Sequence, residues 1–343
     1  MKSKAGDDTK KEHFVPRFYL EKFSNRSPSG KERKIWVFNK MTQTIYTSDI
    51  KDTATDGRFY DFLDDFIEED MKKIFDTDLQ RFENFTAPFY QKFENRLFYI
   101  SKSINKQNHK IKVLKERQKY FWSYILAIQA LRTPKSRNLL NEVKEKADKE
   151  IIIQNLLEKN IDDSVKNIKS HFPKLDTEEI NNIKRFLFDE TFQTIDNLYT
   201  EKSISIAHYS LFCNYIKKLS KVFLKHKWMI GINSTDTLFY TSDHPIVTIR
   251  YYETGYASDG VEILFPINSK VIFIIRDKNY FRNNEGDCSL INLSTEEVIN
   301  YNKSQIFCSN KFLYCQENNF ELAQEICRNN PDALQVNNNV KFI

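Results

Sequence analysis

Glycine is scarce in this chain, with seven among 343 residues. Neither G-x-G-x-x-G nor G-x-x-x-x-G-K-[ST] occurs. Gly255 and Gly260 have the separation that the second motif needs, but Val261 follows where it requires a Lys. Because such loops use glycine to bring backbone N–H groups close to phosphates, we do not expect a nucleotide site of either kind.

Cysteine and long apolar runs are also few. The five cysteines are an odd number without a C-x-x-C, which argues against a disulfide framework and excludes a zinc ribbon. Apolar runs are as short as Val271 to Ile275, whereas a membrane-spanning helix needs about 20 residues. Met1 to Glu12 is charged and lacks the apolar core of a secretory signal, so residues 1–12 are predicted to be a disordered leader. We therefore expect a protein of the reducing cytoplasm with no membrane partner.

Charge is mixed, and the net charge is +5. Residues 10–40 carry nine Lys/Arg and three Glu, a difference of +6, while residues 49–84 carry five against twelve acidic residues, a difference of −7. Residues 101–190 carry nineteen against thirteen, again +6. A basic section beside an acidic one suits a phosphate chain, but ordinary charged helix surface explains the same pattern and is the preferred interpretation.

The order of predicted elements indicates an α+β fold. Residues 35–38 and 44–47 read as a hairpin that turns through residues 39–43, residues 61–226 as a large central helical block, and residues 227–316 as sheet-rich. We expect the amino-terminal hairpin to join the late, mostly antiparallel sheet within a single α+β domain over residues 13–343.

Several local signals sharpen this outline. Pro88 is predicted to divide the first long helical pattern into two helices, and Thr133-Pro134 to kink or break the second. Ser294 to Glu297 is a capping box that opens a helix through about residue 304. Strands are predicted at residues 228–232, 238–240, 246–249, 261–265, 271–275 and 311–315, and a last short helix at 321–327.

The stretch from His13 to Phe23 is denser in aromatic and apolar residues than its surroundings. Pro16 suits the first turn of a short helix, in which Tyr19, Leu20 and Phe23 share one face. His13 then lies just before the positive end of that helix, where a neutral imidazole that accepts a proton or binds a metal is favoured.

Three other stretches carry candidate site residues. Phe239 to Pro245 leads from a strand into a turn with Thr241, Ser242, Asp243 and His244, and Pro245 holds His244 extended. The alternative is that Ser242 and Asp243 only bond turn amides.

Gln129, Arg132 and Thr133 lie near one helical face beside a helix break. There Arg132 can offer a planar fork to a phosphate, or equally pair with an acidic residue at 61 to 70. The aromatic pair Phe59-Tyr60 precedes Asp61 and is more often core than a base-stacking platform.

These stretches together resemble a bacterial family catalogued as a domain of unknown function. The likeness rests on His13-Phe14-Val15-Pro16-Arg17-Phe18-Tyr19-Leu20-Glu21-Lys22-Phe23, on Phe59-Tyr60, on Gln129-x-x-Arg132-Thr133, on Thr241-Ser242-Asp243-His244-Pro245, and on Phe265-Pro266-Ile267. The chain departs from the family pattern where Glu12 replaces the first His of a doublet, Arg17 a Gln, and His244 an Asn. The resemblance implies no established activity.

Two hypotheses follow. The first is an enzyme acting on RNA or DNA, a metal-dependent nuclease of a bacterial defence or toxin system that uses Mg²⁺ or Mn²⁺. His13 would be base or metal ligand, Asp243 a metal ligand or His-orienting carboxylate, and Arg132 a phosphate ligand, with Gln129, Thr133, Tyr60 and Ser242 binding substrate. The second is a non-catalytic binding or sensing module, with nucleic acid or a partner protein of a defence system as ligand, in which the same polar residues are structural. The residues alone favour the second, because a lone His beside a helix is more often structural than catalytic. The resemblance favours the first, because it joins ionisable and strongly polar residues across distant segments.

Overall fold

The computed structural model describes residues 11–26, 33–57, 69–103, 112–136, 166, 176–178, 181, 216–249, 255–279 and 286–334. The chain divides into two compact units, Met1–Ser136 together with Leu211–Ile343, and Arg137–Ser210. Almost all of the described residues belong to the first unit, to which the following refers. The single domain predicted over residues 13–343 stays a prediction. No helix within the described ranges is both long and apolar enough to cross a membrane.

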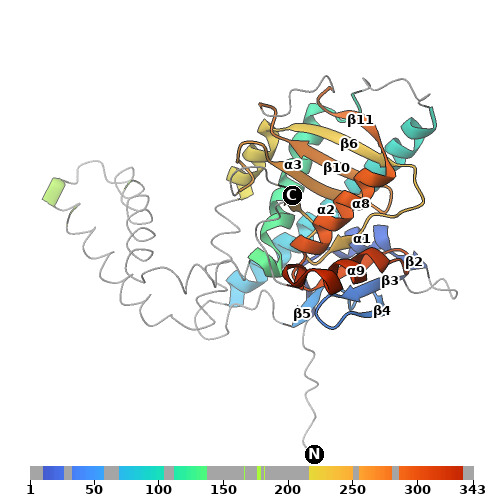
Figure 1. Ribbon diagram of the computed structural model, residues 1–343. Helices are drawn as coiled ribbons and strands as arrows, with labels where there is room; N and C mark the ends of the chain where they lie inside the picture. Colours follow the sequence, from blue (N-terminus) through green and yellow to red (C-terminus); the bar gives the residue numbers. More distant parts are fainter. Residues whose placement is uncertain are drawn as a thin grey trace, which may run out of the picture. The chain divides into compact units, whose positions relative to one another are not determined.

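The first unit has an α+β fold whose larger sheet has the strand order β11-β6-β10-β9-β8 (Figure 1). Only β11 and β6 run parallel, and the other neighbours are antiparallel, as predicted for the late sheet. Its strands are β6 (Lys227–Asn233), β8 (Val247–Ile249), β9 (Glu262–Asn268), β10 (Val271–Arg276) and β11 (Ser289–Leu293). Strand β11 was not predicted from the sequence, because it is short and follows a turn.

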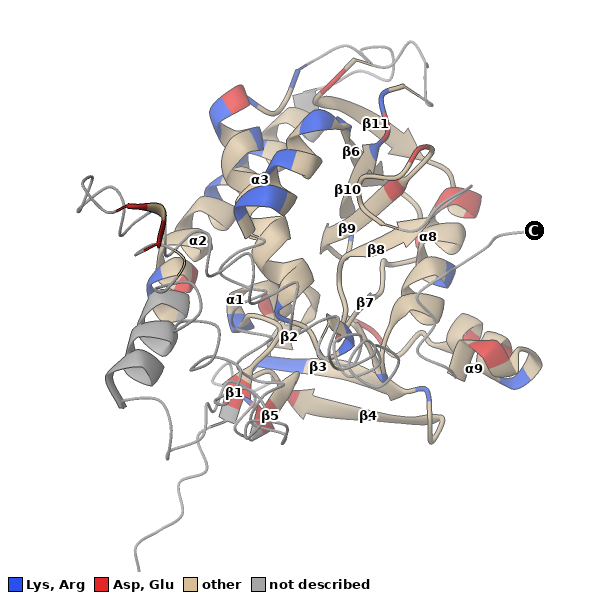
Figure 2. Cartoon of the chain, turned by 90° about the vertical axis from the view of Figure 1, so that its left-hand side faces the viewer, with Lys and Arg blue, Asp and Glu red and all other residues tan. Residues whose placement is uncertain are grey.

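Strand β10 shows how this sheet is covered on both faces. Its even-numbered residues Ile272 and Ile274 lie in an apolar cluster with Val298 and Tyr301 of α8 (Thr295–Cys308). Phe273 points the other way, with its ring centroid 4.9 Å from that of Trp122. Because successive side chains of a strand face opposite sides, α8 covers one face and the helices α2 and α3 cover the other, as Figure 2 also shows.

A second sheet joins the beginning and end of the chain. Its order is β2-β3-β12-β7, with β4 paired to β3. The predicted hairpin is therefore confirmed, and it meets the late strand β12 as expected, although in a sheet separate from the larger one. A small third sheet pairs β1 with β5. The strands are β1 (Lys11–His13), β2 (Asn25–Arg26), β3 (Arg33–Asn39), β4 (Thr44–Asp49), β5 (Thr55–Gly57), β7 (Thr241–Ser242) and β12 (Phe312–Cys315).

The opening helix is shorter than predicted. Pro16 stands at the N-cap rather than in the first turn, with ψ of 139°, and a 3-10 turn replaces the end of the helix. Its predicted apolar face is confirmed, since Tyr19, Leu20 and Phe23 are all buried. The helical elements are α1 (Arg17–Leu20), η1 (Glu21–Phe23), α2 (Glu69–Ser103), α3 (Glu116–Leu131), α8, α9 (Glu321–Asn329), η2 (Pro331–Leu334) and the helical residues 216–225.

Pro88 does not divide α2, contrary to the prediction. Proline removes one helical hydrogen bond to the carbonyl four residues earlier, here that of Asn84. Both residues are exposed, so water can satisfy this carbonyl and the helix continues. The second break is confirmed, because α3 ends at Leu131, before Thr133-Pro134.

Leu238 to Tyr240 is also not a strand, although its apolar run predicted one. The side chain of Asn302 in α8 bonds the backbone of this segment where a neighbouring strand would otherwise do so. Its Oδ1 accepts from the Tyr240 N–H at 2.8 Å, and its Nδ2 donates to the Leu238 carbonyl at 2.8 Å. The capping box is confirmed by Ser294 and Glu297, whose side chains each accept from the other's backbone N–H.

Candidate functional site

Arg132 joins three segments just after α3. Its side chain is 2% exposed. Nη1 donates to Glu83 Oε1 of α2 at 2.8 Å, and Nη2 donates to the backbone carbonyl of His13 at 2.5 Å. Arg132 therefore pairs with the acidic residue Glu83, and it meets His13 through the main chain rather than through the imidazole. Residues 61–68 lie outside the described residues, so the predicted pairing with an acidic residue at 61 to 70 stays a prediction.

Gln129 lies one helical turn before Arg132 and makes the matching contact. Its Nε2 donates to the carbonyl of Phe14 at 3.2 Å. Residues three apart share one helix face, so the spacing of Gln129 and Arg132 lets them hold the consecutive carbonyls of His13 and Phe14. Both side chains fix the opening motif against α3.

The His13 imidazole is half-buried and stays neutral near pH 7. Burial lowers its pKa most, and the charges of Arg17 and Arg132 add to this, while Glu83 and the bond to the Ile50 carbonyl oppose it. Nε2 lies 3.3 Å from that carbonyl oxygen, which can only accept, so we assign the proton to Nε2 and leave Nδ1 as the basic nitrogen. The predicted neutral ring is thus explained mainly by burial, since His13 ends β1 and precedes α1 by three residues.

Asp243 is 1% exposed, and both its carboxylate oxygens are occupied. Oδ1 accepts from the Asn310 N–H at 2.8 Å, and Oδ2 accepts from the amides of Lys311 at 2.7 Å and Phe312 at 2.9 Å. Burial raises the pKa of Asp243, whereas these amides and the nearby charge of Lys40 oppose the shift. The carboxylate shapes the turn between α8 and β12.

Ser242, His244 and Thr133 form a buried chain of contacts beside Asp243. Ser242 Oγ donates to Gln305 Oε1 at 2.8 Å and accepts from the His244 N–H at 3.1 Å. His244 Nδ1 lies 2.8 Å from Thr133 Oγ1. This last contact joins the mid-chain motif to the late turn, so these two predicted stretches do meet.

Sequence reasoning missed two buried lysines, Lys40 and Lys135. Lys40 Nζ donates to the Ser309 carbonyl at 2.5 Å, and Lys135 Nζ donates to the Cys308 carbonyl at 3.2 Å. Both therefore lie at the negative end of α8. Burial lowers the pKa of Lys40, and Asp243 opposes this. Lys40 sits in a hairpin turn, where nothing in the sequence distinguishes it from an exposed lysine.

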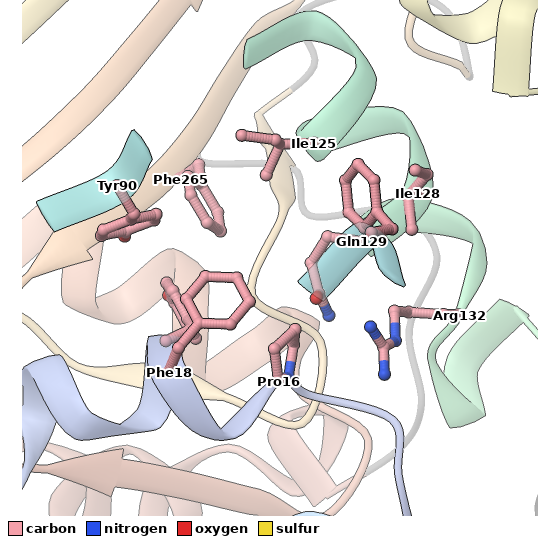
Figure 3. Close-up of a pocket in the computed structure, with 10 residues that line it drawn as sticks. Pro16, Phe18, Tyr90, Ile125, Ile128, Gln129, Arg132 and Phe265 are labelled. Carbon is pink, nitrogen blue, oxygen red and sulfur yellow. The ribbon is translucent and has the colours of Figure 1, made fainter. Parts of the chain in front are cut away.

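A small pocket lies where three motifs meet, with a volume of about 290 Å³ that includes its open mouth. Pro16, Phe18 and Tyr19 come from the opening motif, Gln129 and Arg132 from the mid-chain motif, and Phe265 from β9. Figure 3 shows Gln129 and Arg132 on one side and the rings of Tyr90, Phe18 and Phe265 on the other. The pocket is thus an apolar space with one polar end.

The structure brings His13, Gln129 and Arg132 together in one group and Thr133, Ser242 and Asp243 in another. The Asp243 carboxylate accepts from the amides of residues 310–312, whereas the Arg132 side chain donates to Glu83 and to the His13 carbonyl, so no hydrogen bond among the described residues joins the two. Tyr60 lies outside the described residues. Across the described ranges no group of three or more His, Cys, Asp or Glu side chains is arranged to hold a metal ion.

These contacts define an α+β protein in which polar motif residues bind the amino-terminal segment, a central helix and a late turn to one another. The chain belongs to the family described as "Protein of unknown function (DUF4238)", whose profile matches residues 11–319. No curated protein and no solved structure matches the chain.

Proposed function

We propose that this chain is a non-catalytic binding module, in which the polar motif residues hold distant segments together. The observation that supports this most is the Asp243 carboxylate. A catalytic carboxylate needs an oxygen that faces substrate or metal, and both oxygens of Asp243 accept from amides of residues 310–312 inside the protein. The fork of Arg132 likewise points at Glu83 and the His13 carbonyl.

The ligand we propose first is RNA or DNA, and a partner protein of a bacterial defence system is the alternative ligand. We place the module in the reducing cytoplasm, because Cys288, Cys308, Cys315 and Cys327 are buried free thiols.

A second candidate function is hydrolysis of nucleic acid with His13 as general base. It is favoured by one observation, the neutral ring whose Nδ1 has no hydrogen-bond partner among the described residues. In this case Arg132 would act by orienting the His13 main chain rather than by binding phosphate.

The two candidates are separated by a cleavage assay on purified full-length chain, with RNA, single-stranded DNA and duplex DNA, each with and without Mg²⁺ or Mn²⁺. The variants are His13→Gln and His226→Gln. His226 is a matched control, because it too bonds a carbonyl through Nε2, at 2.7 Å, and has a pKa lowered by burial.

The binding module predicts that no substrate is cut by any of the three proteins. Cleavage that disappears in His13→Gln and persists in His226→Gln, with both variants folded, would overturn it in favour of the hydrolase.

A further inference from the structure

We propose that the outer face of α2, α3 and the helical residues 216–225 is a docking surface for single-stranded nucleic acid. We call it the α2/α3 face, and define it by Phe85, Arg117, Tyr120, Lys217 and Lys221. This inference rests on the proposed binding function and names the partner and the surface. None of these residues belongs to the polar motifs described above.

Positive charge is concentrated at this face. Residues 112–131 contain four Lys/Arg and one Glu, and residues 216–227 contain five Lys and no acidic residue, so the two segments together carry nine against one, a difference of +8. Lys112 and Lys119 are used in ion pairs with Glu116 and Asp287. In Figure 2 the blue Lys and Arg positions recur along the helices near the α3 label.

Three of these cations are well placed for phosphate. Arg117, Lys217 and Lys221 are exposed, and none has an ion-pair partner among the described residues. A cation that is exposed and unneutralised can release the counterions of a phosphate backbone when it binds. The charges of these three residues are therefore available to a polyanion.

Aromatic rings lie among these cations. Phe85 is 66% exposed and Tyr120 is 54% exposed. The Phe85 ring packs edge-on against Phe121 with centroids 5.1 Å apart, and the Tyr120 ring lies 5.1 Å from that of Tyr124, with their hydroxyls 3.2 Å apart. Each exposed ring is thus held by a more buried one, which lowers the entropy lost when a base stacks on it.

The lysines and the rings belong to one surface. The pKa of Tyr124 is lowered first by its hydrogen bond with Tyr120, and then by Ser220, Lys217 and Lys221, while burial opposes this. Lys119 Nζ of α3 donates to the carbonyl of His226 at 3.0 Å, so the helical residues 216–225, which end just before His226, lie beside α3. Lys217 and Lys221 therefore belong to a helix that neighbours the one carrying Arg117 and Tyr120.

This combination fits single strands better than other polyanions. Lysines and arginine bind the phosphates of any nucleic acid, but exposed rings gain contact only with bases that are not already stacked in a duplex. The tyrosine hydroxyls make the surface more polar than the Leu- and Phe-rich face that an anionic membrane selects. An acidic peptide would bind the cations, but its carboxylates gain no specific contact from the exposed rings.

The test measures equilibrium binding of the full chain by fluorescence anisotropy at two salt concentrations. The probes are labelled 20-mers of oligo(U) and oligo(dT), a 20-base-pair duplex, anionic phosphatidylserine vesicles and poly-glutamate. The variants are Lys217→Gln with Lys221→Gln, and Tyr120→Ser. Matched controls are Lys34→Gln with Lys278→Gln, and Tyr46→Ser, which change exposed residues elsewhere.

We expect the single strands to bind more tightly than the duplex. The lysine pair variant is expected to weaken binding at least tenfold and to lower the salt slope by about two. Tyr120→Ser is expected to weaken binding about 5- to 150-fold, the range for one stacked base. The controls stay within twofold of the original chain. A difference between oligo(U) and oligo(dT) tells which sugar is preferred.

Each other outcome overturns the proposal. Single strands that bind all variants equally place the nucleic-acid site elsewhere and leave the proposed binding function standing. Binding to the duplex that is unchanged in Tyr120→Ser would contradict the preference for single strands. Binding only to vesicles or only to poly-glutamate assigns the face to a membrane or an acidic protein. Binding to none of the probes removes the nucleic-acid partner, whereas His13-dependent cleavage removes the non-catalytic function instead.

Discussion

The hydroxyl of Tyr19 lies 2.7 Å from the hydroxyl of Thr241, 222 residues later in the chain. Tyr19 also donates to the Pro266 carbonyl at 2.8 Å, so Thr241 must be the donor in the bond between the two hydroxyls. Burial raises the pKa of Tyr19 far above its usual range, which keeps its proton in place. One hydroxyl thus ties α1 to both β7 and β9.

Removal of this hydroxyl should destabilise the fold. In Tyr19→Phe the Pro266 carbonyl and the Thr241 hydroxyl both lose a buried partner, so we expect the free energy of unfolding to fall by about 2 kcal/mol. Urea denaturation measures this. Tyr46→Phe is the control, because Tyr46 is 43% exposed and should change by less than about 0.5 kcal/mol. An equal effect of the two changes would contradict the role of Tyr19.

Asp243→Asn tests the carboxylate that accepts three amides. An Asn side chain presents an NH₂ group to at least one of these N–H donors, so a donor meets a donor in a buried site. We expect a loss of about 3 kcal/mol in unfolding free energy. Asp236→Asn changes an exposed Asp and should be neutral. Near-normal stability of Asp243→Asn would show that the turn does not depend on the carboxylate.

Gly231 in β6 leaves no room for a side chain. A Cβ there would lie 2.7 Å from Leu293 Cδ1 and 2.8 Å from Ile272 Cγ2. Because the core around β10 is close-packed, Gly231→Ala should cost about 1–3 kcal/mol. Gly286→Ala is the comparison, since its nearest contact is at 3.9 Å and its backbone conformation suits alanine. Thermal denaturation of both variants tests the difference.

Stability should fall as pH drops below 6.5. Burial lowers the pKa of both His13 and His226 from the ordinary value of 6.5. The unfolded chain then takes up protons at a higher pH than the folded one, so the stabilisation is complete above 6.5 and is lost as pH falls through the folded pKa values.

Urea midpoints between pH 7.5 and pH 5 measure this effect. The double variant His13→Gln, His226→Gln should lose part of the slope over this interval. An unchanged slope would mean that neither imidazole differs between the folded and unfolded states.

Much of the fold follows from local pattern. The hairpin β3–β4, the strands β6, β9 and β10 and the capped start of α8 are each specified by periodicity or by cap residues a few positions apart. Local pattern does not predict the structure of a segment whose backbone is bonded by a residue far away in the chain. Residues 238–240 form an apolar run typical of a strand, but the Asn302 side chain bonds the N–H of Tyr240 and the carbonyl of Leu238. Nothing in the run itself indicates these bonds.

The sequence predicted which residues of the candidate site lie together better than it predicted what their polar atoms bind. His13, Gln129 and Arg132 do lie together, as do Thr133 and Ser242 through His244. However, their polar atoms bond other groups of the protein: main-chain carbonyls for His13 and Gln129, and side chains for Thr133 and Ser242. Whether a buried carboxylate meets substrate or amides depends on how residues 310–312 fold back, which spacing along the chain does not encode.

The pairing of β3 with β12 has a consequence for how the chain is made. Asn39 pairs with Phe312, and 312 − 39 = 273 residues separate them. At synthesis rates of about 5–20 residues per second, roughly 14 to 55 s pass before β3 can meet its partner. During that time one edge of the nascent hairpin has no strand paired to it. The side chains of Ile35 and Val37 are buried in the folded protein but remain exposed until β12 arrives. The order of translation therefore makes the first sheet to emerge among the last to close.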